Sequence, residues 1–150
     1  MLDEELVAVF SAIAETLFDT ELSPLSEPAL PPGRGALTAR IDYRGGFAGS
    51  LSATVEEPLA RQLTSIMMKI APARCTQDDL YDALGEVVNI AAGNLKGLLP
   101  GDCQVSLPHV QEAALSAHDE LHSALSLASF ALFGRAVTVE LRGDSVFPSD

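Results

Sequence analysis

One stretch of the sequence, residues 76–100, constrains the fold more than any other, because its apolar residues recur with the period of an α-helix. At about 100° per residue, the apolar side chains fall within a band roughly 80° wide. They are Leu80, Leu84, Val87, Ala91, Leu95 and Leu98. Thr76 and Asp79 have the spacing of a capping box, and Pro100 ends the pattern. The sequence therefore predicts a helix from Thr76 to Pro100 with one buried face.

A polar stripe lies on the opposite side of this predicted helix. At spacings of four, three, four and three, it consists of Asp82, Glu86, Asn89, Gly93 and Lys96. Acidic residues on a helix are usually only solvated, so the simplest interpretation is a solvent-facing surface. Asn89 and the flanking Gly85 and Gly93 are nevertheless poor helix formers, glycine by up to about 1 kcal/mol relative to alanine. Small residues around a carboxylate and a carboxamide favour the alternative, in which a partner docks closely on this stripe.

The N-terminal part predicts a helix and then an irregular connection. Residues 3–19 begin with acidic side chains and continue with apolar residues at helical spacing, which is typical of an amphipathic helix. Residues 21–34 contain four prolines and little periodicity. Proline removes backbone donors and favours extended chain, so we expect a proline-rich loop there.

Strand-like alternation dominates the remainder. Residues 36–55 alternate on both sides of Gly45 and Gly46, which predicts a hairpin, and Pro58 marks the first turn of a second helix. Residues 104–110 alternate up to Pro108, which suits a sheet edge or a strand end.

Two further strands are predicted near the C-terminus. Residues 123–133 are apolar on both faces, whereas residues 136–142 alternate cleanly. A doubly apolar strand is expected inside a sheet or beneath a second copy of the chain.

These elements predict an α+β fold, in which a mainly antiparallel sheet is packed by about three helices. With 150 residues and 47% hydrophobic content, the chain has room for one domain over residues 1–150. Residues 36–142 would form its core, and residues 143–150 a polar tail.

Charge and composition exclude several functions. A formal charge of −12 argues against a protein that grips phosphate backbones, so we expect no nucleic acid partner. No apolar run reaches the roughly 20 residues that span a bilayer, and the first residues are acidic where a signal peptide would be basic. We therefore expect a cytoplasmic protein without a membrane partner.

Metal chemistry has little support. Cys75 and Cys103 are the only cysteines and are not in a metal-ligand spacing. His118 and His122 are four residues apart and could offer two ligands on a helix, but no third ligand is placed by sequence. We predict no metal site, and we interpret His109 as a surface residue.

The polar stripe resembles a known signature. Asp82, three residues, Glu86, two residues and Asn89, followed by Pro108 in the phrase Val-Ser-Leu-Pro, is similar to the signature of the CheX, CheC and FliY chemotaxis phosphatases. The resemblance extends over about residues 35–142, although the gap from Asn89 to Pro108 is slightly shorter than the usual pattern. One copy of the signature is similar to CheX and unlike CheC, which carries two.

This resemblance implies a CheC/CheX-like fold, a homodimer and a function. The implied activity is dephosphorylation of the phospho-aspartate of a CheY-like response regulator, with Asn89 orienting the water and Glu86 pairing with the regulator's lysine. The Mg²⁺ is expected on the partner's receiver domain, and no cofactor is bound by this chain. Partner contacts would come from Asp82, Gly85, Gly93 and Lys96.

Two alternatives stay open from the sequence. A fold does not certify an activity, so the chain could be a non-catalytic receiver-binding adaptor or a scaffold such as a flagellar switch component. A metal-dependent hydrolase using His118 and His122 is the other alternative. The first differs from a phosphatase in having no need for the carboxamide of Asn89.

Overall fold

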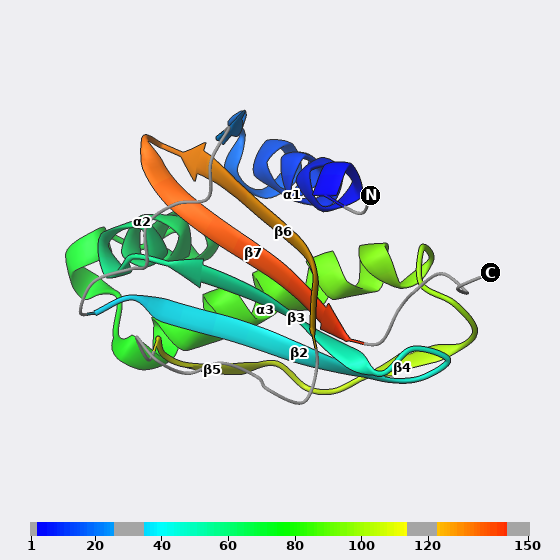
Figure 1. Cartoon of the computed structure of the whole chain (residues 1–150). Coiled ribbons are helices and arrows are strands. Elements are labelled where there is room, and N and C mark those ends of the chain that lie inside the picture. Colours follow the sequence, from blue (N-terminus) through cyan, green and yellow to red (C-terminus); the bar gives the residue numbers. More distant parts are fainter. Residues whose placement is uncertain (1–2, 26–34, 114–122, 144–150) are drawn as a thin grey trace.

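The computed structural model describes residues 3–25, 35–113 and 123–143 (Figure 1). Its helices are α1 (Asp3–Phe18), α2 (Glu57–Met68) and α3 (Gln77–Lys96), with a short 3-10 helix, η1 (Pro72–Arg74), between the last two. Its strands are β1 (Ser23–Pro24), β2 (Leu37–Gly45), β3 (Gly49–Val55), β4 (Cys103–Val105), β5 (His109–Glu112), β6 (Ser123–Leu132) and β7 (Arg135–Gly143).

The strands form one antiparallel sheet in the order β1-β6-β7-β3-β2-β4, and β5 also pairs with β2. The hairpin of β2 and β3 is confirmed, with Leu37 opposite Val55 and Tyr43 opposite Gly49. The predicted α+β fold with three helices against an antiparallel sheet is therefore confirmed.

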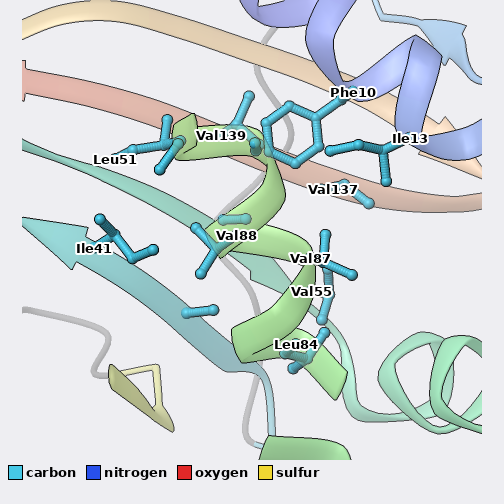
Figure 2. Close-up of a cluster of buried hydrophobic side chains, with 14 of the residues drawn as sticks. Phe10, Ile13, Ile41, Leu51, Val55, Leu84, Val87, Val88, Val137 and Val139 are labelled. Atoms are coloured by element: carbon cyan, nitrogen blue, oxygen red, sulfur yellow. The ribbon is translucent and has the colours of Figure 1, made fainter. Parts of the chain in front are cut away.

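The helices cover one face of the sheet, and the hydrophobic core lies between this helical layer and the sheet (Figure 2). Every second residue of the central strands points into this layer, because side chains alternate along a strand. Ile41, Leu51 and Val139 are fully buried there, together with Val88 of α3. Phe10 of α1 packs on the edge of this core, its ring centroid 5.6 Å from that of Phe130.

The single strand predicted at 104–110 is interrupted. β4 pairs with the end of β2 and β5 with its beginning, and Pro108 lies in the break between them. Proline has no N–H to donate to a neighbouring strand, which explains the break. The chain resumes pairing beyond Pro108 and continues to Glu112, two residues past the predicted end.

The strand β6 is apolar on both faces, as predicted, but is buried mainly on one. Phe130 and Leu132 face the helices and are buried, whereas Leu127 is 38% exposed. A bulge between Ala124 and Ser126 shifts the alternation. β6 lies between β7 and the two-residue β1, which the sequence did not reveal because it falls in the proline-rich segment.

Candidate functional site

Helix α3 is the element that carries the candidate site. It packs against the sheet and also against α1 and α2, so its buried face is wider than the predicted band. The buried residues are Leu80, Ala83, Leu84, Gly85, Val87, Val88, Ala91, Ala92 and Leu95. The predicted polar stripe is exposed along its whole length, at Asp82, Glu86, Asn89, Gly93 and Lys96.

The C-terminal end of the predicted helix is wrong by one turn. α3 ends at Lys96, and the next residues form tight turns in which the N–H of Leu98 donates to the carbonyl of Leu95. Leu99 is buried after this turn, and Leu98 is 50% exposed instead of lying on the core face.

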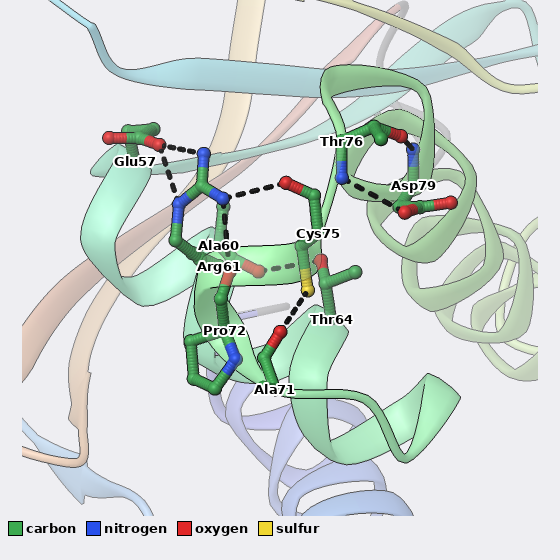
Figure 3. A network of polar contacts seen from close by, with 9 residues as sticks. All are labelled: Glu57, Ala60, Arg61, Thr64, Ala71, Pro72, Cys75, Thr76 and Asp79. Carbon is green, nitrogen blue, oxygen red and sulfur yellow. Dashed lines mark hydrogen bonds and ion pairs between the residues drawn. The ribbon is translucent and has the colours of Figure 1, made fainter.

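The start of α3 is held by its predicted capping box (Figure 3). The N–H of Asp79 donates to Oγ1 of Thr76 at 3.1 Å, and the N–H of Thr76 donates to the carboxylate of Asp79 at 2.9 Å. Together these bonds satisfy two of the N–H groups that a helix start leaves unpaired.

Arg61 of α2 braces the turn that leads into α3 (Figure 3). Its Nη1 donates to the carbonyls of Cys75 at 2.7 Å and Pro72 at 3.1 Å, while Nη2 donates to Glu57 at 2.6 Å. Because one guanidinium binds three groups in a fixed plane, it sets the position of the α3 start relative to α2.

Gly85 fixes the distance between α3 and the segment that contains Pro108. A Cβ at Gly85 would lie 3.3 Å from Cβ and 3.4 Å from Cγ of Pro108, so the proline packs directly on the helix backbone. Pro108 of the same chain therefore occupies the space beside the Cβ position of Gly85, and the contact of Gly85 with a partner stays a prediction. Gly93 is different, since no described atom lies within 4 Å of its Cβ position.

The residue before this proline segment is tied to β2. The N–H of Asp42 donates to Oγ of Ser106 at 2.9 Å, and the N–H of Ser106 donates to the carbonyl of Asp42 at the same distance. Oγ of Ser106 in turn donates to the carbonyl of Leu107. Ser106 therefore keeps this segment hydrogen-bonded to β2 across the break between β4 and β5.

A groove of about 290 Å³ lies between α3 and this segment. Its lining combines two carboxylates with aromatic, small and apolar side chains: Tyr81, Asp82, Gly85, Glu86, Pro108, His109 and Val110. The exposed carboxylates of Asp82 and Glu86 give it an anionic wall, which attracts cations such as an amine.

The second half of α3 is attached to the sheet by Tyr43 of β2. Its buried hydroxyl donates to the carbonyl of Ala92 at 2.8 Å. Burial, with a contribution from the charge of Cys103, raises the pKa of Tyr43 well above its ordinary value, so the phenol remains a donor. This bond lies one helical turn after Asn89.

The sequence-predicted site residues separate into two groups. Asp82 and Glu86 line the groove, with Asn89 on the same exposed stripe, whereas Gly93 and Lys96 lie further along the helix. The sequence interpretation missed the places of Tyr81 and His109 in the groove. Their adjacency to Asp82 and to Pro108 was the only available signal.

Among residues 3–25, 35–113 and 123–143, no group of three His, Cys, Asp or Glu side chains could hold a metal ion. His118 and His122 lie outside the described residues, so their metal hypothesis is not tested. Within the same ranges, no helix combines the length and apolar character needed to cross a membrane.

A three-helix layer on an antiparallel sheet, with an acid–amide stripe beside a proline segment, defines a CheC/CheX-like protein. The sequence model described as chemotaxis phosphatase CheX matches residues 37–127, more than half of the chain. The chain therefore belongs to the CheX family of chemotaxis phosphatases.

Solved structures share this fold at low identity. CheX from Vibrio vulnificus is 22% identical with a TM-score of 0.74, over 94% of this chain and 95% of that one. A CheC-like protein from a Shewanella species is 22% identical with a TM-score of 0.76, over 95% and 96%. A CheX–CheY–BeF3–Mg complex from Borrelia burgdorferi contains a chain that is 16% identical with a TM-score of 0.74, over 95% and 97%. No curated protein sequence matches the chain.

Proposed function

We propose that this chain is a phosphatase that hydrolyses the phospho-aspartate of a CheY-like response regulator. The observation that carries the proposal is the exposure of Glu86 and Asn89 on one stripe of a helix whose start and middle are held in place. Membership in the CheX family and the existence of a CheX–CheY complex in a relative support it.

In the proposed mechanism Asn89 orients the attacking water. A receiver domain supplies its own Mg²⁺ and lysine to neutralise phosphoryl charge, so the helper protein mainly has to place a water in line with the scissile P–O bond. A carboxamide can donate to one group and accept from water without becoming charged. Asn89 is exposed on its helix, as this role requires.

Glu86 anchors the receiver in this proposal by pairing with its lysine amine. Both Glu86 and Asp82 line the groove, so an amine entering it would meet two carboxylates. An ion pair closed off from water by an interface fixes register better than an exposed pair. Gly93 and Lys96 would extend the contact along α3, while Gly85 acts indirectly by holding Pro108.

The remaining parts of the proposal concern setting and assembly. We place the activity in the cytoplasm, with Mg²⁺ on the receiver and no cofactor on this chain, and we expect a homodimer. The homodimer is separable from the reaction, because the stripe of one chain contains both proposed catalytic residues, Glu86 and Asn89.

The test is the decay of a ³²P-labelled receiver in Mg²⁺, alone and with the wild type, Glu86→Ala or Asn89→Ala. We expect Asn89→Ala to lower the rate by about 10- to 10³-fold, equivalent to about 1.4–4 kcal/mol of lost water positioning, while receiver binding persists. Glu86→Ala should weaken binding as well. Asn94→Ala is the matched control, because Asn94 is exposed on the same helix but outside the stripe.

A non-catalytic adaptor gives a different result. If a receiver binds this chain but loses label no faster with the wild type than alone, the chain is a receiver-binding adaptor and not a phosphatase. Full activity in Asn89→Ala would instead contradict the assigned mechanism.

A further inference from the structure

Leu107 is an unusual feature of the surface beside the groove. Its side chain is 88% exposed, whereas the other exposed large apolar side chains in the described residues lie between 36% and 50%. Burying a leucine fully is worth about 1.5–3 kcal/mol, so a leucine displayed to this extent leaves that free energy available for an interaction.

The backbone at Leu107 is held on both sides. Ser106 exchanges two hydrogen bonds with Asp42 of β2 and a third with the carbonyl of Leu107. On the other side, Pro108 has a fixed φ and packs against Gly85 of α3. The segment thus presents Leu107 from a fixed platform, which reduces the entropy lost when a partner binds it.

The position of Leu107 connects it with the proposed site. It directly precedes Pro108, which lines the groove together with Asp82 and Glu86. An apolar anchor next to charged groups is the common composition of an interface, in which one buried side chain supplies much of the affinity and the polar groups supply orientation.

Resting on the proposed function, we propose that Leu107 is the apolar anchor for the receiver, inserting into an apolar depression beside its phosphorylated aspartate. Leu107 then sets affinity and partner choice, and Asn89 acts on the reaction itself. The occupant is the receiver and not an unrelated protein, because whatever engages the groove carboxylates also lies against the segment that displays this leucine.

The experiment compares Leu107→Ser, Leu107→Met and Leu98→Ser. The control Leu98 is 50% exposed and follows the far end of α3, so it offers a matched leucine away from the groove. The probes are the unphosphorylated receiver saturated with BeF3⁻ and Mg²⁺, for the binding constant, and the ³²P-labelled receiver, for KM and kcat.

We expect Leu107→Ser to raise Kd and KM together by about 10- to 100-fold, the range that corresponds to loss of a buried leucine, with kcat and Tm unchanged. Leu107→Met should retain most of the affinity, because methionine fills similar apolar space. Leu98→Ser should behave as wild type.

Three results would contradict the proposal that Leu107 anchors the receiver. The first is an unchanged Kd and KM in Leu107→Ser. If Asn89→Ala is inactive in the same assay, that result leaves the proposed phosphatase function in place. A fall in kcat alone would give the leucine another role. Unaltered receiver binding with a change from dimer to monomer in sedimentation would assign Leu107 to a contact between copies of this chain.

Discussion

The two halves of α3 are built differently, although one polar stripe runs along both. The first half is fixed from three directions, by the capping box at Thr76, by the brace of Arg61 and by Pro108 packed on Gly85. The second half has the hydrogen bond from Tyr43 and an unobstructed surface at Gly93.

This difference matches the demands of the proposed function. Placing a water for in-line attack needs geometry held within a fraction of an ångström. Glu86 lies at the end of the fixed first half, and Asn89 lies between it and the hydrogen bond from Tyr43 to Ala92, so both benefit from these attachments. A docking surface needs mainly an open backbone that a partner can approach. The first half of α3 is therefore held in position by its contacts, and the second half leaves the helix surface open at Gly93.

The largest stability effect is expected where the first half is most tightly packed. Gly85→Leu forces a side chain into the space of Pro108 and should lower the free energy of unfolding by about 1–3 kcal/mol, the usual cost of overpacking. It should also reduce phosphatase activity, because displacement of Pro108 changes the groove. Denaturant unfolding and label decay measure the two effects.

Gly93→Leu is the control for this change, since a Cβ at Gly93 meets no described atom within 4 Å beyond its own turn of helix. Equal destabilisation by the two leucines would remove the distinction between a packed half and an open half of α3.

The next effect concerns the attachment of the second half. Tyr43→Phe removes the bond to the carbonyl of Ala92 but keeps the ring packed against Phe47, 5.8 Å between centroids. We expect a loss of about 1 kcal/mol, seen as a lower Tm. Tyr81→Phe is the matched control, because within the described residues the Tyr81 hydroxyl makes only an exposed bond with Gln77, and its loss should leave Tm unchanged.

The pH dependence follows from the same phenol. Burial raises the pKa of Tyr43 in the folded chain, so the folded state holds this proton more tightly than the unfolded state. The associated stability is complete below about pH 10, the ordinary tyrosine pKa, and is lost as the pH rises beyond it. Wild type should therefore lose its Tm advantage over Tyr43→Phe in alkaline buffer, and an advantage that grows there would contradict the assignment.

The sequence predicted those parts of the fold in which periodicity and burial coincide. The β2–β3 hairpin, the capping box of α3 and the exposed stripe were all visible, because each depends on neighbours within a few residues. β1 was not visible, since Ser23 and Pro24 become a strand only through pairing with β6. Leu98 was misplaced because the end of a helix is set by packing as much as by the next proline.

The residue types of the site were predictable from the sequence, but the different roles of its two glycines were not. Gly85 and Gly93 look equivalent in sequence, eight residues apart on one helix. Only the return of Pro108 across α3 makes one of them a packing residue and leaves the other open. The groove beside Glu86 likewise requires His109 and Val110 from a distant strand.

Gly93→Ala is expected to give the smallest effect and to separate the stability of the second half from its function. Alanine is favoured over glycine inside a helix by about 0.5–1 kcal/mol, and here its methyl group meets no described atom within 4 Å, so Tm should rise by a few degrees. If the receiver lies close to this part of the stripe, the same methyl group should weaken its binding a few-fold. We expect both results, measured by thermal unfolding and by titration of the receiver in BeF3⁻ and Mg²⁺. A higher Tm with unchanged affinity would confine the receiver contact to the half of α3 that Pro108 and Arg61 hold in place, and would make Lys96 a solvated side chain.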